Sequence, residues 1–170
     1  EIEFKLDYTL PLSKARKFEA GYEREMDDSE EETGLYDYVS ETDRLVVRPE
    51  FNHRTQYERQ IDAVYGIYAD EWANLGIQAG LRGEYTGRRI TVVLTGENFE
   101  IDRWDYFPTL HASYRFPKNH QLMASYTRRI NRPRGYYLEP FETWMDAYNV
   151  RQGNPALKPE YIDALEAGYQ

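Results

Sequence analysis

The chain has 170 residues, a formal net charge of −9 and no cysteine. These values indicate about one domain and exclude disulfide bonds, thiolate metal sites and cysteine nucleophiles. The negative charge argues against nucleic acid as a partner, because phosphate binding needs a basic face. The 26 aromatic residues (16 Tyr, 7 Phe and 3 Trp) argue against disorder. No run of about 18 apolar residues is present, so no transmembrane helix is predicted.

Alternating apolar and polar residues predict a series of antiparallel strands. The first covers 2–10, where Ile2, Phe4 and Leu6 share one face with Tyr8 and Leu10. After a tight turn at 11–14, further strands are predicted at 16–25, 57–69, 75–86, 103–116, 121–129 and from about 161. Short turns at 70–74 and 117–120 alternate with long connections at 27–53, 87–102 and 130–159, where residues 90–94 could extend a strand. Short turns on one side and long loops on the other are typical of outer-membrane barrels.

Each predicted strand has one apolar face and one polar face. On the apolar faces, aliphatic residues occupy the strand centres, and aromatic residues such as Tyr85 and Tyr126 lie at the ends, as in membrane girdles. On strand 57–69 the apolar face is assigned to Ile61, Ala63, Tyr65 and Ile67. The opposite faces carry Glu3, Lys5, Asp7, Asp62, Arg82, Glu84, His111 and Arg115. So many ionisable groups need water or dense pairing. The pattern predicts an all-β, antiparallel, up-and-down transmembrane barrel with a polar interior, and a soluble β-domain is the alternative.

Several motifs in the last third of the chain resemble those of TonB-dependent receptors, in the branch called the outer membrane β-barrel family. They lie at 124–133 (Ala-Ser-Tyr-Thr-Arg-Arg-Ile-Asn-Arg-Pro), 137–141, 152–160 (Gln-Gly-Asn-Pro-Ala-Leu-Lys-Pro-Glu) and 166–169 (Glu-Ala-Gly-Tyr). Residues 81–86 and 103–108 also resemble strand openings of that family, and the resemblance is specific from about residue 103 onward. The resemblance implies a barrel of about 22 strands, plugged by another domain and opened by the TonB complex. Residues 1–170 would supply about seven of these strands without plug or signal peptide. The chain starts and ends in mid-strand, so we expect it to be part of a longer protein.

The same motifs are expected to set the shape of the last long connection. Pro155 and Pro159 favour an extended path and cannot donate to a ladder, and the pair Asn154 and Pro155 favours a turn. The residues given this structural role are Arg128, Arg129, Arg132, Pro133, Gly153, Asn154, Pro155, Leu157, Pro159 and Glu160.

Candidate ligand-binding residues also lie in this connection. The aromatic cluster of Tyr136, Tyr137, Phe141, Trp144 and Tyr148 suits glycan stacking or peptide recognition, or alternatively packs the loop onto itself. Arg132 and Arg134, with the two arginines before them, could contact lipopolysaccharide or an anionic ligand, although pairing with lumenal acids is favoured. For the acidic residues 23–32, a solvated loop is favoured over a calcium site.

No motif indicates an enzyme, a metal site or a cofactor. The three histidines are far apart, and Ser113 and Ser125, which share a face with His111, belong to no nucleophile motif. The favoured function is TonB-dependent uptake of a metal chelate, glycan or peptide across the cell outer membrane. The alternatives are a passive porin or structural barrel and, less favoured, a soluble β-domain that binds a small molecule. The expected partners are outer-membrane lipid, the nutrient, the TonB complex through the plug, and a surface lipoprotein.

Overall fold

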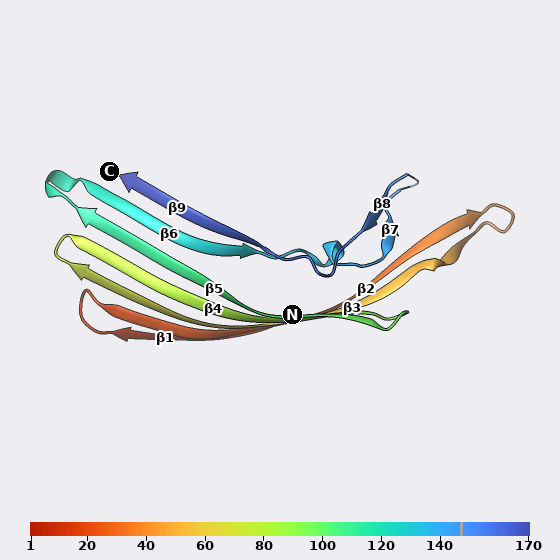
Figure 1. The fold of residues 1–170 in the computed structure, drawn as a ribbon, viewed down its shortest axis with the longest axis horizontal. Helices are drawn as coiled ribbons and strands as arrows, with labels where there is room; N and C mark the ends of the chain where they lie inside the picture. The colour runs from red at the N-terminus through yellow and green to blue at the C-terminus, as the bar shows by residue number, and fades with distance from the viewer. Residues whose placement is uncertain (147) are drawn as a thin grey trace.

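The computed structural model describes residues 1–146 and 148–170, which form one large antiparallel sheet and a small hairpin (Figure 1). Strands of the sheet lie side by side in chain order. They are β1 (Ile2–Pro11), β2 (Lys17–Val39), β3 (Arg44–Trp72), β4 (Leu75–Val92), β5 (Glu97–Arg115), β6 (Gln121–Asn131) and β9 (Glu160–Tyr169). The hairpin pairs β7 (Glu142–Trp144) with β8 (Val150–Gln152), and the 3-10 helices η1 and η2 cover Pro117–Asn119 and Gly135–Tyr137. Among the described residues, no helix is long and apolar enough to cross a membrane.

The predicted all-β, antiparallel, up-and-down architecture is confirmed, and each predicted strand is present. The sheet does not close on itself, because β1 and β9 are its two edges. The three short turns are where they were expected. One of them is a two-residue hairpin between β3 and β4 in which Ala73 has a φ of 49°.

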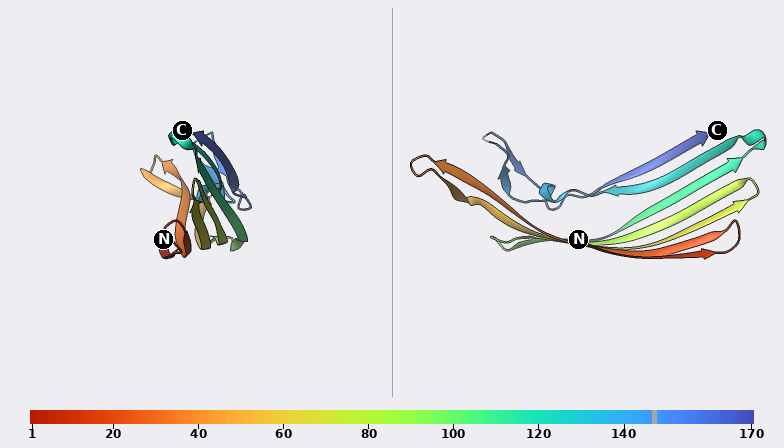
Figure 2. Two further views of the ribbon diagram at one scale, coloured as in Figure 1. Left: turned by 90° about the vertical axis from the view of Figure 1, so that its left-hand side faces the viewer. Right: turned by 180° about the vertical axis from the view of Figure 1, so that it is seen from behind.

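The prediction that 27–53 is an irregular connection was wrong. β2 continues to Val39 and β3 begins at Arg44, so the two strands form a long ribbon that extends past their neighbours (Figures 1 and 2). Cross-strand ion pairs join Arg54 to Glu30 and Arg48 to Asp37, and such pairs offset the low strand propensity of an acidic segment. Residues 87–102 also form mainly strand. The extension considered for 90–94 is confirmed as far as Val92, and residues 93–96 form the turn before β5.

The register assigns each residue to a face of the sheet. Tyr68 lies opposite Ala79, and Asp62 lies opposite Tyr85. Directly paired residues point to the same side, so the even-numbered residues of β3 share the apolar face. The assignment of Ile61, Ala63, Tyr65 and Ile67 to that face was therefore wrong, as was that of Asp62 to the polar face. The assignments for the neighbouring strands agree with the register.

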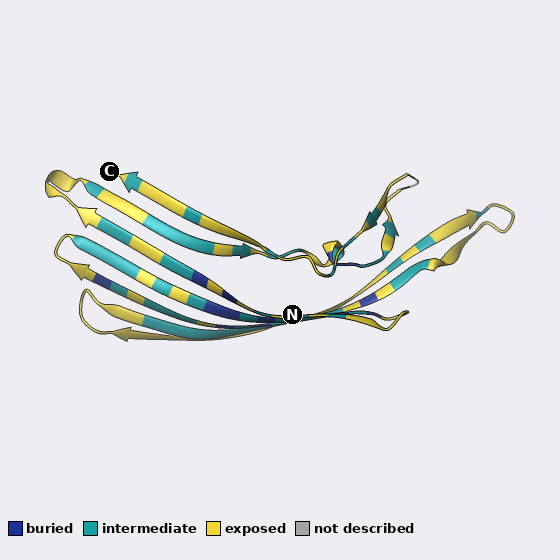
Figure 3. Cartoon of the chain, in the orientation of Figure 1, coloured by how far each residue is buried: buried dark blue, intermediate teal, exposed yellow. Residues whose placement is uncertain are grey.

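We call the face that carries Leu6, Leu81 and Leu110 the outer face, and these three side chains are exposed. Figure 3 shows how exposed, intermediate and buried positions follow one another along the strands. The opposite, inner face holds the buried apolar side chains of the sheet. These are Ile61, Ala63, Ile90, Val92 and Phe107. One face of the sheet thus holds the apolar core, and the other exposes large apolar residues. Large exposed apolar surfaces mark contact with a membrane or with another protein.

Tyrosine side chains mark one end of the apolar band on the outer face. The hydroxyl of Tyr85 donates to Asp102 over 2.9 Å, and that of Tyr126 donates to Asp163 over 2.8 Å. Next to the latter pair, Arg128 donates to the same Asp163 at 2.7 and 2.9 Å. Rings that face an apolar band and hydroxyls that reach polar partners are typical of residues at a membrane interface.

Candidate functional site

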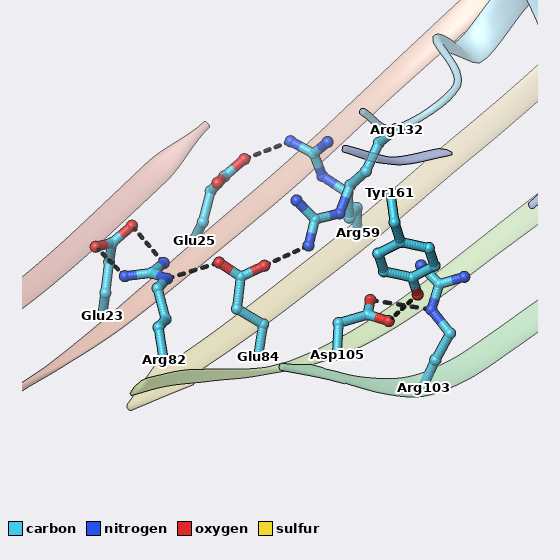
Figure 4. Close-up of polar contacts among 9 residues, drawn as sticks. All are labelled: Glu23, Glu25, Arg59, Arg82, Glu84, Arg103, Asp105, Arg132 and Tyr161. Atoms are coloured by element: carbon cyan, nitrogen blue, oxygen red, sulfur yellow. Dashed lines mark hydrogen bonds and ion pairs between the residues drawn. The ribbon is translucent and has the colours of Figure 1, made fainter. Parts of the chain in front are cut away.

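A chain of ion pairs crosses the inner face from β2 to the segment after β6 (Figure 4). Its centre is Arg82 on β4, which donates to Glu23 over 3.1 Å and to Glu84 over 2.6 Å. The second carboxylate oxygen of Glu84 accepts from Arg132. Glu84 is 7% exposed, and a buried carboxylate is stable only when it is paired. The network therefore ties the last long connection to the sheet.

Two further clusters lie beside this chain of ion pairs (Figure 4). Arg59 on β3 donates to Glu25. Asp105 on β5 accepts from Arg103 over 3.0 Å and from the hydroxyl of Tyr161 on β9. Positive and negative groups thus alternate across this part of the inner face.

The segment 132–159 folds back over the inner face. The backbone N–H of Gly153 donates to the carbonyl of Glu139, and that of Asn154 donates to Tyr137, both over 2.7 Å. Leu138 between these anchors is 1% exposed. A Cβ atom at Gly153 would lie only 2.6–2.7 Å from the backbone of Tyr137 and Glu139, so this close approach requires glycine.

The motif residues are brought together at the base of this segment. The side chain of Asn154 accepts from the N–H of Ala156 over 3.0 Å, which makes a local turn. Arg88 on β4 donates to the carbonyl of Pro155 over 2.8 Å. Glu160 accepts from Asn131 over 3.3 Å. Pro133, Leu157 and Pro159 line a small cavity described below.

The four clustered arginines have different environments. Arg128 pairs with Asp163 on the outer face, whereas Arg132 pairs with Glu84 on the inner face. Arg129 and Arg134 form no ion pair with any described residue. The cluster is therefore split between the two faces of the sheet.

A model of the outer membrane protein beta-barrel family matches residues 1–170. The chain belongs to this family. No curated protein and no solved structure matches it significantly. The protein is located in the outer membrane, so the exposed apolar outer face of the sheet meets lipid and the inner face lines the barrel interior.

In this outer-membrane protein, the predicted aromatic residues of the last loop do not share one surface. Phe141 stacks on His53 at 4.2 Å between centroids, and Trp144 meets the edge of Phe51 at 6.0 Å. The rings of Tyr136 and Tyr137 lie 4.1 Å apart between centroids, and the guanidinium of Arg151 lies over the ring of Tyr136. Tyr148, the last of the five, is 94% exposed. The contacts to His53 and Phe51 pack the loop against the β2–β3 ribbon, a contact that the sequence did not suggest.

A cavity of about 360 Å³ lies between this loop and the barrel wall. Its lining includes Glu31 and Tyr57 from the wall, and Arg134, Tyr136 and Glu139 from the loop. Burial is the main cause that raises the pKa of Glu139, and the nearby Glu31 carboxylate is the second cause. The Glu139 carboxylate accepts a hydrogen bond from Arg151 over 2.9 Å. The sequence analysis missed Glu139 and Arg151, because nothing in their spacing indicates that they meet.

The remaining predicted groups also have defined positions. The acids of 23–32 lie in β2, where Glu23 and Glu25 pair with arginines. Within 1–146 and 148–170, no group of three or more His, Asp or Glu side chains could hold a metal ion. His111 lies opposite Ser125 on the inner face, as expected, and it forms no hydrogen bond with Ser125 or Ser113 in the described chain.

Proposed function

We propose that this chain forms part of the wall of a TonB-dependent receptor that takes up a bulky nutrient, such as a metal chelate, a glycan or a peptide. The observation that supports this most is the segment 132–159. It carries the motifs that resemble this receptor family, and it is anchored over the inner face by Arg132 and by the carbonyl of Pro155. We propose no catalytic role and no cofactor for the chain.

The charges of the inner face also favour a receptor over a passive porin. Rings of like-charged side chains are one source of ion selectivity in a pore. Here Arg82, Glu84 and Asp105 belong to a pattern in which opposite charges alternate and pair. Such a wall suits contact with a polar plug, through which we propose that the TonB complex acts.

We further propose that additional strands complete the barrel. β1 and β9 each leave one edge without a partner in the described sheet. Unpaired backbone groups at a strand edge are strongly unfavourable in lipid, which closed barrels avoid. Outer-membrane lipid is thus one partner of the outer face, and a surface lipoprotein is a candidate partner of the loops.

The decisive experiment compares transport and conductance for the full-length protein. Growth on iron chelates, glycans and peptides is measured in a strain that lacks the gene, with and without complementation, in TonB-positive and TonB-negative backgrounds. The purified protein is then inserted into planar bilayers. A receptor requires both the gene and TonB for growth on its nutrient, and it gives no steady open conductance. Growth that persists without TonB, together with a stable open pore, would establish the passive porin instead.

A further inference from the structure

A second, much smaller cavity lies under the base of the last loop. Its volume is about 30 Å³, and its lining combines apolar residues such as Ile101 and Leu157 with several arginines. Arg59, Arg88, Arg103 and Arg132 all line it, whereas no Asp or Glu does. In Figure 4 the guanidinium groups of Arg59 and Arg132 lie next to each other between Glu25 and Glu84. Four cations around one enclosed space repel each other unless something negative lies between them.

Several buried donors around this cavity have no partner among the described residues. The Nε–H groups of Arg59, Arg88 and Arg132 are buried without an acceptor, and so is the hydroxyl of Thr86. All four side chains line the cavity. A buried donor without an acceptor costs about 1–3 kcal/mol, so four such donors at one place indicate a missing acceptor.

The charges near the cavity leave one cation without a carboxylate. Arg59 pairs with Glu25 and Asp27, and Arg103 and Arg132 each pair with one acid of the inner face. Within the described part of the chain, Arg88 donates only to the carbonyl oxygen of Pro155, which is neutral. Arg88 is therefore the one arginine of the lining whose charge no described carboxylate pairs.

We propose that this cavity binds one small monovalent anion of the halide class, with chloride as its natural occupant. A cavity of about 30 Å³ holds one or two water-sized species, which is too small for a nucleotide, a sugar acid or another multi-atom ligand. Water must donate as well as accept hydrogen bonds. The unpartnered groups of this lining are three arginine Nε–H donors and one hydroxyl, which favours an ion that only accepts. The anion joins Arg59 and Arg88 of the wall to Arg132 and so holds the base of the loop.

Bromide provides the direct test, because it resembles chloride and its anomalous scattering identifies it. The full-length protein is crystallised in detergent with sodium bromide in place of sodium chloride. The expected result is an anomalous peak inside the cavity bounded by Arg59, Arg88 and Arg132. A cavity that holds only water, or that is filled by a carboxylate from another part of the full-length chain, would overturn the proposal.

Two neighbouring arginines make a matched pair of variants. Arg88→Gln removes the uncompensated charge, whereas Arg89→Gln changes an exposed residue that pairs with Glu100 and Glu58. At constant ionic strength, the thermal midpoint should be higher in chloride than in gluconate for the wild type and Arg89→Gln. Arg88→Gln should lose this difference. Equal chloride effects in both variants would refute the site, and the bromide map of the wild type decides the question if Arg88→Gln does not assemble.

Discussion

Replacement of Gly153 by alanine should release the last loop from the barrel wall. The added Cβ would lie 2.6 Å from the carbonyl oxygen of Tyr137 and 2.7 Å from the backbone nitrogen and oxygen of Glu139. Atoms this close must separate, and the contacts are to backbone, so the two 2.7 Å hydrogen bonds at this position must break or lengthen. Each is worth about 1 kcal/mol, and the burial of Leu138 contributes about 1.5–3 kcal/mol more.

The upper limit for the change in the free energy of loop opening is thus about 3–5 kcal/mol. Since about 1.4 kcal/mol corresponds to a tenfold change, protease treatment of intact cells should cleave the loop faster than in the wild type, by up to about 10³-fold. Gly135→Ala is the control in the same segment, because a Cβ there meets no atom within 4 Å. Equal cleavage rates for Gly153→Ala and the wild type would refute this steric argument, and so would an equal increase for Gly135→Ala.

Three further changes test the faces, the ion pairs and the pH response. Val64→Arg puts a charge on the lipid face and should reduce the free energy of barrel assembly by up to about 2–4 kcal/mol. Ile67→Arg puts the charge on the inner face and should assemble. Heat-modifiable electrophoretic mobility measures assembly of both variants. Arg82→Gln leaves Glu23 without its cation and Glu84 with Arg132 alone, and it should lower the unfolding free energy in urea by about 1.5–3 kcal/mol. The raised pKa of Glu139 favours its neutral form in the docked loop. Its contribution to docking is therefore complete below pH 4.5, the ordinary pKa of a glutamate, and is lost as the pH rises through the raised pKa. A spin label attached at Tyr148→Cys would report this loss as increased mobility.

Each of these expectations has an opposite outcome that contradicts it. Normal assembly of Val64→Arg with failure of Ile67→Arg would restore the original face assignment of this strand. An unchanged urea midpoint for Arg82→Gln would mean that solvent already screens its ion pairs. If Glu139→Gln kept the pH response of the label, another group would be responsible for it.

The strands of the sheet could be predicted from alternation alone, but the two faces of β3 could not. Ile61 and Ala63 are apolar because they are buried on the inner face, at 6% and 1% exposure, and not because they meet lipid. Asp62 is polar because it lies beyond the apolar band, where it accepts from Tyr22 and Arg24. In a barrel wall with packing on both faces, apolar character does not distinguish lipid from protein, and only pairing with a neighbouring strand does. This also explains Tyr65, whose position in mid-strand did not fit a membrane girdle.

The candidate site could be predicted only in part, because its contacts join residues that are distant in sequence. Arg132 and Pro155 belong to motifs that were visible in the sequence. Their partners, Glu84 and Arg88, lie on β4, and only the register reveals that both face inward. The strand structure of the acidic part of β2, beyond residue 27, was missed for a similar reason. Its low strand propensity is offset by arginines on β3.

Ion pairs join the loop to the wall in addition to its aromatic contacts. Glu84 accepts from Arg82 within the wall and from Arg132 of the loop, so one buried carboxylate serves both. Removal of either arginine leaves Glu84 with only one cation, and the effects of the two losses should be coupled, because they share this carboxylate. A rearrangement of the barrel interior that withdrew Arg82 would therefore strengthen the hold of Glu84 on Arg132. Displacement of Arg132 would in turn free Glu84 for Arg82. This shared carboxylate gives a physical route by which the position of the last loop and the charge state of the barrel interior influence each other.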